Sequence, residues 1–413
     1  MSLMKSWVAS ANSADTPFPL NNLPYGVFSV GDDAPRCGVA IGDMILDMAA
    51  AEEAGLITLP EPVFDLPYWN DVMEMGPAVW ADLRAQLMAL LGEGGNEAAP
   101  LVAQADAQMH MPFAVSEFTD FYAGKHHAMN IGTMFRGPEN ALPPNWLHIP
   151  IGYNGRASSV VVSGTDVVRP NGQTKAPDAA APSFGPCKRL DIELELGAIL
   201  GQSTELGQPV SVAEADAMIF GYVLLNDWSA RDIQAWEYQP LGPFQAKAFA
   251  TSISPWIVTS AALEPFRTST PERERDLLPY LQEPRPMLYD IDLSVTMAPA
   301  GKDATVIART NYNQMYYSAA QQVAHHASSG CAMSAGDLIG TGTISGPEKS
   351  ERGSLVELTW GGKEPLTLEG GETRTFIEDG DTLGLHGAAR GDGYQVGFGS
   401  CLGTIRPAPK FPA

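Results

Sequence analysis

Short apolar runs separated by turn residues fill most of the chain, and they predict a β-rich α+β protein. Residues 78–91 are the clearest helix, because apolar side chains recur there at helical spacing and a glycine-rich segment at 92–96 follows. A second helix opens at the capping box of Ser211 and Glu214, and a third covers residues 315–327. Strands are expected at residues 27–30, 37–41, 44–46, 160–163, 221–225, 290–297, 355–360 and 382–385.

A polar stripe follows the apolar run at residues 221–225. Asp227, Arg231, Gln234 and Tyr238 stand four, three and four residues apart, so a helix would place them on one face. Two interpretations are open. The stripe is either a site anchored to a buried strand, or a solvated helix with an Asp–Arg pair worth only about 0.2–0.5 kcal/mol.

Apolar and acidic residues alternate over residues 190–196, so a strand there would show Asp191, Glu193 and Glu195 on one face. Like charges repel at that spacing, and a hard divalent cation would bind them through oxygen. An edge strand with an acidic solvent face is the alternative. Farther upstream, Asp120 and Tyr122 share a face of another expected strand by the same argument.

Taken together, these residues resemble the fumarylacetoacetate hydrolase family, and the resemblance covers almost the whole chain. It implies a small N-terminal SH3-like barrel domain at residues 1–115 and a large mixed β-sandwich roll at residues 116–413. The sequence Met111-Pro112 before the strand of Asp120 is consistent with a boundary there. The segments that carry the resemblance are residues 22–29, 140–148, 155–165, 226–238, 240–244, 342–348 and 391–394.

Composition narrows the possible partners. A chain of 413 residues favours two domains, and a formal charge of −23 disfavours nucleic acid and anionic membranes as partners. An anionic substrate would therefore need local positive charge or a metal. Four scattered cysteines without C-x-x-C spacing indicate free thiols, and we find neither a signal peptide nor a membrane span. We expect a cytoplasmic protein; the resemblance implies a homodimer.

The resemblance implies that four acids bind one divalent ion at the active site: Asp120, Glu193, Glu195 and Asp227. Four carboxylates around one such ion leave two negative charges, which Arg231 and Lys247 could offset. Both Ca2+ and Mg2+ suit oxygen ligands, and the sequence does not choose between them. The resemblance also implies a second Mg2+ near Lys247 and Thr251. The alanines around Lys247 make that loop less free than the glycine and serine usual in the family.

His127 matches the catalytic histidine of the family, and Glu357 matches the acid that orients it. The unit would then resemble a serine triad in which a bound water replaces the serine. From the pattern alone, the pair of His126 and His127 could also be ordinary loop residues. We interpret the second pair, at residues 325–326, as structural. Alternation over residues 355–360 places Glu357 on a strand, pointing inward.

The substrate implied by the resemblance is 4-fumarylacetoacetate, a β-diketo acid cleaved to fumarate and acetoacetate late in tyrosine and phenylalanine breakdown. Lys247, Gln234 and Arg231 would stabilise charge and protonate the leaving group. Arg136 has the planar fork that suits a carboxylate. For each aromatic residue, simple packing is the alternative. The positions that match substrate contacts are Tyr122, Arg136, Tyr153, Gln234, Tyr238 and Thr343.

The sequence does not match two motifs of other enzyme classes. Ser345 stands one place late for a G-x-S-x-G elbow, and no H-E-x-x-H sequence occurs. Three hypotheses remain: hydrolysis of fumarylacetoacetate; hydrolysis, decarboxylation or isomerisation of another acylpyruvate or oxo acid on the same metal site; and a non-catalytic protein that binds calcium for stability.

Overall fold

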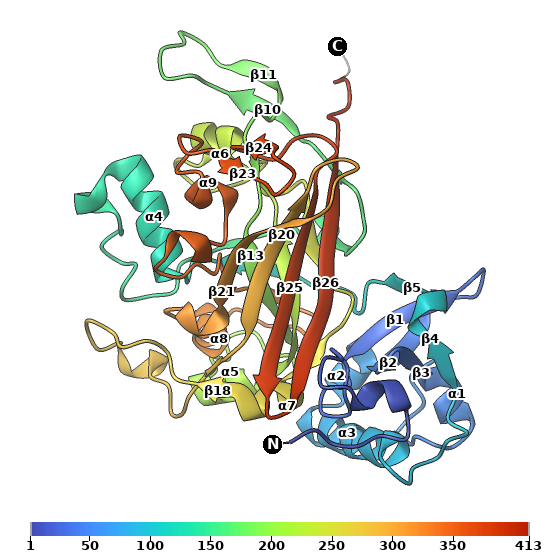
Figure 1. Ribbon diagram of the computed structural model, residues 1–413. Coiled ribbons are helices and arrows are strands. Elements are labelled where there is room, and N and C mark those ends of the chain that lie inside the picture. Colours follow the sequence, from blue (N-terminus) through green and yellow to red (C-terminus); the bar gives the residue numbers. More distant parts are fainter. Residues whose placement is uncertain (1, 412–413) are drawn as a thin grey trace.

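The computed structural model describes residues 2–411 as a β-rich mixed α/β protein built around three larger sheets (Figure 1). The first sheet lies near the N-terminus and is antiparallel, with the strand order β4-β3-β2-β1-β5. Helix α3 contributes four buried leucines, as its apolar spacing predicts. The elements of this region are β1 (Tyr25–Val30), β2 (Arg36–Ile41), β3 (Met44–Asp47), α1 (Met48–Glu53), α2 (Asn70–Glu74), α3 (Pro77–Leu91), β4 (Leu101–Ala103) and β5 (Ala107–His110).

The second sheet has eight strands in the order β7-β6-β22-β13-β14-β16-β8, with β17 also paired to β14. Its central strands β13 and β14 are buried along their whole length. This sheet brings strands from residues 118 to 340 side by side, which matters for the site below. Its strands are β6 (Phe118–Phe121), β7 (Gly152–Asn154), β8 (Val160–Val162), β13 (Leu194–Leu200), β14 (Ile219–Asp227), β16 (Thr251–Ile253), β17 (Val258–Thr259) and β22 (Leu338–Gly340).

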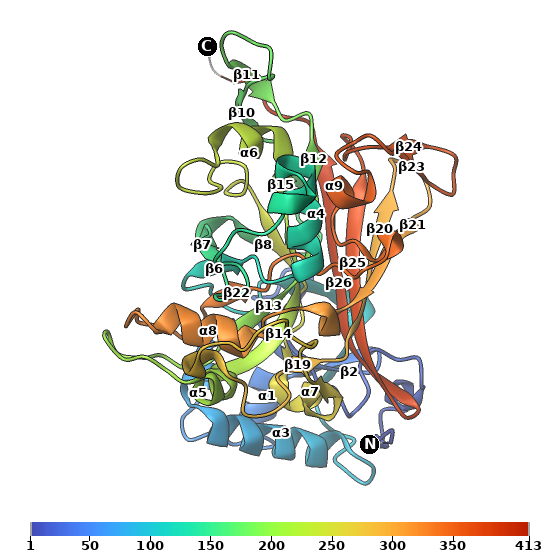
Figure 2. The ribbon, with the colours of Figure 1, turned by 90° about the vertical axis from the view of Figure 1, so that its left-hand side faces the viewer.

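The third sheet contains the longest strands, β25 and β26, which run across the molecule beside β14 (Figures 1 and 2). Its order is β21-β20-β25-β26-β9. The strands are β9 (Val167–Val168), β20 (Asp292–Ala298), β21 (Thr305–Asn311), β25 (Thr382–Gly391) and β26 (Tyr394–Arg406). The remaining α-helices are α4 (Lys125–Arg136), α5 (Val212–Met218), α6 (Arg231–Glu237), α7 (Ser260–Leu263), α8 (Ala319–Ala327) and α9 (Leu355–Leu358).

Four short two-stranded sheets complete the fold. One of them matters below: β12 (Leu190–Asp191) pairs with β15 (Ser229–Ala230). The other pairs are β10 (Asn171–Thr174) with β11 (Ser183–Pro186), β18 (Arg267–Thr268) with β19 (Leu288–Tyr289), and β23 (Leu366–Thr367) with β24 (Thr373–Arg374). Among residues 2–411, no helix combines the length and apolar character that a membrane crossing requires.

One hydrophobic cluster joins the N-terminal sheet to the second sheet. Tyr25 of β1 stacks on Trp69 with ring centroids 4.2 Å apart, and Phe220 of β14 lies 5.7 Å from the Tyr25 ring. The backbones of Tyr25 and Ile257 exchange two hydrogen bonds of 2.9 and 2.7 Å. Apolar side chains of β13, β14 and β22 belong to the same cluster. The N-terminal region therefore shares its core with the rest of the chain.

Four local predictions differ from the structure. The expected strand at 190–196 is broken, because β12 ends at Asp191 and β13 begins at Leu194. Residues 355–358 form helix α9 instead of a strand; its last turn closes through Thr359, whose hydroxyl donates to the Leu355 carbonyl, and positive φ angles at 360–362 end it.

The polar stripe is likewise not a single helix. Asp227 is the last residue of strand β14, and helix α6 begins only at Arg231, after the short strand β15. Tyr238 then follows the end of that helix. The predicted helix at 315–327 is shorter than expected as well, because the capping box of Ser318 and Gln321 starts it at Ala319.

Candidate active site

Four acidic side chains meet inside the second sheet, although they come from distant parts of the chain. Asp120 lies on β6, Glu195 on β13 and Asp227 at the end of β14, while Glu193 directly precedes β13. All four are buried, and one carboxylate oxygen of each lies within 4.8 Å of the others. Strands β6, β22, β13 and β14 are consecutive in the sheet, and this order brings the acids together.

The cluster has the features of a cation site. Asp120 Oδ1, Glu195 Oε1 and Asp227 Oδ1 are buried and, among residues 2–411, have no hydrogen-bond partner. Buried charged oxygens without a partner are costly, so their convergence favours an ion that would compensate them. Carboxylate oxygen is the ligand that Ca2+ and Mg2+ prefer. These four acids therefore fit a hard divalent cation.

Two cations border the cluster. The ammonium of Lys247 contacts Asp227 and lies 2.5 Å from Glu193 Oε2. Arg231 Nη2 lies 2.7 Å from Glu193 Oε1. Burial alone would raise the pKa of Glu193, but the charges of Lys247 and Arg231 outweigh it and hold that pKa below its ordinary range. Glu193 is thus the carboxylate whose charge is best compensated.

The other acids have the opposite shift. Burial, together with the negative charge of Asp227, raises the pKa of Asp120 well above its ordinary value. Burial and the charges of Asp120 and Asp227 do the same to Glu195. Without further positive charge the protein therefore resists having all four carboxylates ionised at once.

A histidine held by a carboxylate lies beside the acids. Nδ1 of His127, on α4, is 2.6 Å from Glu357 Oε2 on α9, and its Nε2 is 3.7 Å from Glu193 Oε1. Burial would raise the pKa of Glu357, but His127 and hydrogen bonds from Asn130 and Ser354 lower it overall. Three further donors contact this carboxylate: Asn130 Nδ2 at 2.8 Å, Ser345 Oγ at 3.0 Å and Ser354 Oγ at 2.6 Å.

Most of the other predicted site residues adjoin this centre. Tyr122 meets the His127 ring edge-to-face at 5.4 Å, and the Tyr153 hydroxyl donates to Asp227 Oδ2 at 3.0 Å. Gln234 Oε1 accepts from Arg231 Nη1 at 3.2 Å. Thr251 is paired with Asp227 across strands β14 and β16. Thr343 is buried in the segment that follows β22.

Two predicted residues do not reach the cluster. Arg136, at the last position of α4, is exposed and donates to the backbone carbonyls of Asn140 and Ala141 at 3.1 and 2.6 Å. Tyr238 is 42 % exposed. Both side chains are therefore on the protein surface and not among the buried acids.

Sequence reasoning missed several residues that shape the site. Asn130 could have been found, because it stands three residues after His127 and so shares its helical face. Ser345 was considered only as a nucleophile, and its hydroxyl instead donates to Glu357. Ser354 contacts Glu357 three residues farther along the chain, but the strand expected at residues 355–360 hid this contact. Gly340 leaves room for Asp120 and Glu195, and this depends on how distant strands align.

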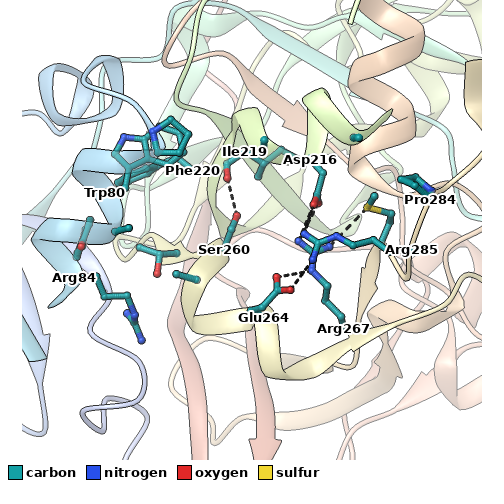
Figure 3. A pocket seen from close by; sticks show the side chains of 18 residues that line it. Trp80, Arg84, Asp216, Ile219, Phe220, Ser260, Glu264, Arg267, Pro284 and Arg285 are labelled. Atoms are coloured by element: carbon teal, nitrogen blue, oxygen red, sulfur yellow. Dashed lines mark hydrogen bonds and ion pairs between the residues drawn. The ribbon is translucent and has the colours of Figure 1, made fainter. Parts of the chain in front are cut away.

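A cavity of about 130 Å³ opens at the acids and is lined by Tyr153, Asp227, Phe244 and Lys247, among others. A larger cavity of about 460 Å³ lies between α3 and the segments around α5 and α7 (Figure 3). There Arg267 and Arg285 both pair with Asp216 and Glu264. None of the predicted site residues lines the larger cavity, so we assign the site to the carboxylate cluster.

A carboxylate-held histidine beside a buried set of oxygen ligands, on a β-rich fold, is the arrangement expected of a metal-dependent hydrolase. The fold is similar to that of a fumarylacetoacetate hydrolase structure from the psychrophile Exiguobacterium antarcticum, with a TM-score of 0.53 and 16 % identity over 93 % of this chain and 99 % of that one. At this identity the similarity shows the fold alone.

Sequence comparison is more specific. The family model "Fumarylacetoacetase N-terminal" matches residues 21–112, and "Fumarylacetoacetate (FAA) hydrolase C-terminal" matches residues 117–406. The chain is 48 % identical to a fumarylacetoacetase of Arabidopsis thaliana, over 99 % of this chain and 100 % of the relative. It is 46 % identical to that of Homo sapiens, over 95 % and 97 %. The chain belongs to the fumarylacetoacetase family.

Proposed function

We propose that this protein hydrolyses the carbon–carbon bond of 4-fumarylacetoacetate and yields fumarate and acetoacetate. Similarity to fumarylacetoacetases over nearly the whole chain supports this reaction. The observation that carries the proposal is the placement of His127. Its Nδ1 is fixed by Glu357 at 2.6 Å, while its Nε2 faces the acids, 3.7 Å from Glu193.

Asp120, Glu193, Glu195 and Asp227 would hold Ca2+ or Mg2+, and their orphaned oxygens support this assignment. When bound, such an ion supplies Lewis acidity toward the oxygens of a β-diketone. A second Mg2+ near Lys247 and Thr251 remains a prediction.

His127 is the proposed general base. Glu357 accepts a hydrogen bond from Nδ1–H and so leaves Nε2 free to take a proton from water, a role worth roughly 10²–10⁴-fold in rate. The water oxygen then bonds to the carbonyl carbon, and the carbon–carbon bond breaks with its electron pair on the acetoacetate side. Arg231, Lys247 and Gln234 offer N–H donors toward the charge that develops. The leaving carbon gains one proton, and the proton that His127 took from water balances it.

Tyr122 contacts His127 and Tyr153 contacts Asp227, while Thr343 is buried in the segment after β22. All three are proposed to contact the substrate. Arg136 and Tyr238 are proposed to anchor it from the surface side. For Arg136 this requires exchange of at least one of its bonds to the carbonyls of Asn140 and Ala141.

The finer architecture is also a proposal. We infer an SH3-like barrel at residues 1–115 and a β-sandwich roll at residues 116–413, and the two family models that match on either side of this boundary support the division. A cytoplasmic homodimer that acts in tyrosine and phenylalanine catabolism is the expected setting.

Turnover by purified protein tests the reaction. After chelation and reloading with Ca2+ or Mg2+, the protein should remove the diketone absorbance of fumarylacetoacetate and release fumarate and acetoacetate in equal amounts. His127→Ala should lower kcat by at least about 10²-fold. His325→Ala is the matched control, because His325 contacts Tyr280 away from the acids and should retain turnover.

The outcomes separate the alternatives. No turnover by metal-loaded protein would contradict the proposal. Turnover of another acylpyruvate, with fumarylacetoacetate left intact, would move the chain to a different reaction on the same centre. Near-normal turnover by His127→Ala would exclude the histidine as the base.

A further inference from the structure

Asp191 has no role in the reaction as described, yet it is one of the most enclosed charged residues in the chain. Its exposure is 0 %. It ends β12 and is separated from the four-acid cluster, which contains Glu193 and Glu195 but not Asp191. The alternating pattern had placed all three on one face. The break in the strand instead turns Asp191 toward other partners.

Both carboxylate oxygens of Asp191 are occupied. Oδ1 accepts from the backbone N–H groups of Ile192 at 2.8 Å and Leu355 at 2.7 Å. Oδ2 accepts from Arg231 Nε at 2.8 Å and from the Val356 N–H at 3.2 Å. Asp191 is therefore saturated with donors and has no oxygen to offer a metal or a substrate.

Leu355 and Val356 are the first two residues of α9, the helix that carries Glu357. Residues before a helix normally satisfy such N–H groups with their own side chains. Ser354, which occupies that position, makes no such bond, because its hydroxyl donates to Glu357 instead. Asp191 takes over the capping role from a distant strand and leaves Ser354 free to hold the carboxylate.

The contacts of Asp191 connect the two halves of the site. Asp191 fixes the first turn of α9, and this helix carries Glu357, which holds His127. Asp191 also holds the guanidinium of Arg231, which contacts Glu193. Oε1 of Glu193 is 2.7 Å from that guanidinium and 3.7 Å from His127 Nε2. The path from Asp191 through Glu357, His127, Glu193 and Arg231 returns to Asp191, so each member constrains the next.

We propose that Asp191 is a positioning residue that sets the base and the guanidinium at fixed places relative to each other. The inference rests on the proposed function for its kinetic readout, but its geometric content is independent of the substrate. It predicts that a change at Asp191 disturbs Glu357 and Arg231 together while the four metal-binding acids stay assembled.

Asp191→Asn is the main test. The amide keeps the shape but turns an NH2 group toward donors that need an acceptor. We expect kcat per metal-loaded molecule to fall at least 30-fold, with KM changed less than about threefold and metal stoichiometry unchanged. Asp381→Asn is the matched control: Asp381 is 1 % exposed and accepts from Arg374 and a backbone N–H, but it contacts no site residue. It should keep kcat within twofold.

A double variant separates positioning from general damage. Because Asp191 acts in part through Glu357, Asp191→Asn combined with Glu357→Gln should lose clearly less kcat than the product of the two single losses, since coupled residues are not additive. A multiplicative loss would overturn the proposal, and so would wild-type turnover by Asp191→Asn. If Asp191→Asn does not fold, Asp191→Glu serves instead. This variant keeps the charge beside Arg231 but displaces the carboxylate from α9. Wild-type kcat in that variant would also overturn the proposal.

A spectroscopic readout works even if fumarylacetoacetate is not the substrate. The Nδ1 proton between His127 and Glu357 should give a low-field resonance that Glu357→Gln abolishes. We expect it to shift or broaden in Asp191→Asn and to stay in place in Asp381→Asn. An unchanged resonance in Asp191→Asn would overturn the positioning role, whereas failure of the wild type to turn over substrate would overturn only the proposed function.

Discussion

At the scale of single residues, the site is a balance of buried charge. Four carboxylates face two close cations, Lys247 and Arg231, so ionisation of all four acids would give an excess of two negative charges. A divalent cation would cancel that excess. Such a balance explains why Glu193, which touches both cations, has a lowered pKa, while Asp120 and Glu195 have raised ones.

Lys247→Met removes one of the two cations. Breaking a buried ion pair typically costs about 3–5 kcal/mol because the remaining charge is left uncompensated. We therefore expect a clear drop in Tm in metal-free buffer, a partial recovery with Ca2+, and a loss of kcat of about 10²-fold or more, all measurable by thermal unfolding and turnover. Lys349→Met is the control, because its pair with Glu364 is half exposed and should contribute little to stability. Equal effects of the two substitutions would contradict this account.

Asp337 gives a pH dependence that is separate from the metal centre. Burial, opposed by a bond from the Ser334 N–H and reinforced by Glu117, raises its pKa to about 6. The unfolded value is about 3.9, so the folded state holds the proton more tightly. The resulting stability is complete below about pH 4 and is lost as the pH rises through about 6, at most about 3 kcal/mol in size.

Asp337→Asn should remove that dependence. Relative to the wild type, the variant should gain stability between pH 5 and pH 8, as measured by urea unfolding at both values. Asp392→Asn, at an exposed position, should show no such gain. A wild-type and Asp337→Asn difference that stays constant from pH 5 to pH 8 would show that Asp337 does not titrate in this range.

At the scale of elements, sequence periodicity located most strands and helices but not their ends. Helix α3 and strands β1, β2 and β3 follow the patterns that predict them. The break after Asp191 and the helix at Glu357 could not be predicted, because each depends on the other: the carboxylate of one caps the first turn of the other. Local patterns carry no information on a contact between residues 164 positions apart.

The predicted site residues converge for a similar reason. The alternating pattern correctly predicted that Glu193 and Glu195 lie in one cluster. It also predicted Asp191 on the same face, but the break in the strand places Asp191 outside the cluster. The convergence of Asp120 and Asp227 on the same centre came only from the family resemblance, since it depends on the strand order of the sheet.

Strand β22 is the element that allows this convergence, and Gly340 is its critical position. A Cβ atom at Gly340 would lie 2.5 Å from Asp120 Oδ1 and 3.2 Å from Glu195 Oε2. Gly340→Ala should therefore displace both carboxylates and weaken Ca2+ binding at least tenfold, as measured by calorimetric titration.

Gly197→Ala is the matched control for that substitution. Gly197 is the direct partner of Gly340 on β13, but a Cβ atom there would meet the side chains of Leu338, Leu225 and Val223. It should lower stability through overpacking, by about 1–3 kcal/mol, and leave Ca2+ affinity unchanged. Equal Ca2+ affinities for the two variants would show that Gly340 does not set the spacing of the acids.

At the scale of the whole molecule, the N-terminal region is tied to the sheet that carries the site. Phe220 of β14 packs against Tyr25 and Trp80, and Tyr25 pairs with Ile257 through its backbone. Asn22 also donates to the Gly397 carbonyl at 2.8 Å. The strands that hold Asp120, Glu195 and Asp227 thus have one face covered by apolar groups from the first hundred residues.

Residues 116–413 expressed alone should therefore not form a working centre. Removal of residues 1–115 uncovers Phe220, Ile257 and Leu338, all of which are at most 2 % exposed in the full chain. We expect aggregation or a loss of cooperative unfolding, measured by light scattering and calorimetry, and no Ca2+ binding at micromolar concentration.

In the full chain, Phe220→Ala should cost about 3–5 kcal/mol and reduce the heat-unfolding midpoint in a single transition, because the shared core unfolds as one unit. Two separate transitions, or a monodisperse and Ca2+-binding 116–413 fragment, would show instead that the C-terminal region is stable without its N-terminal cover.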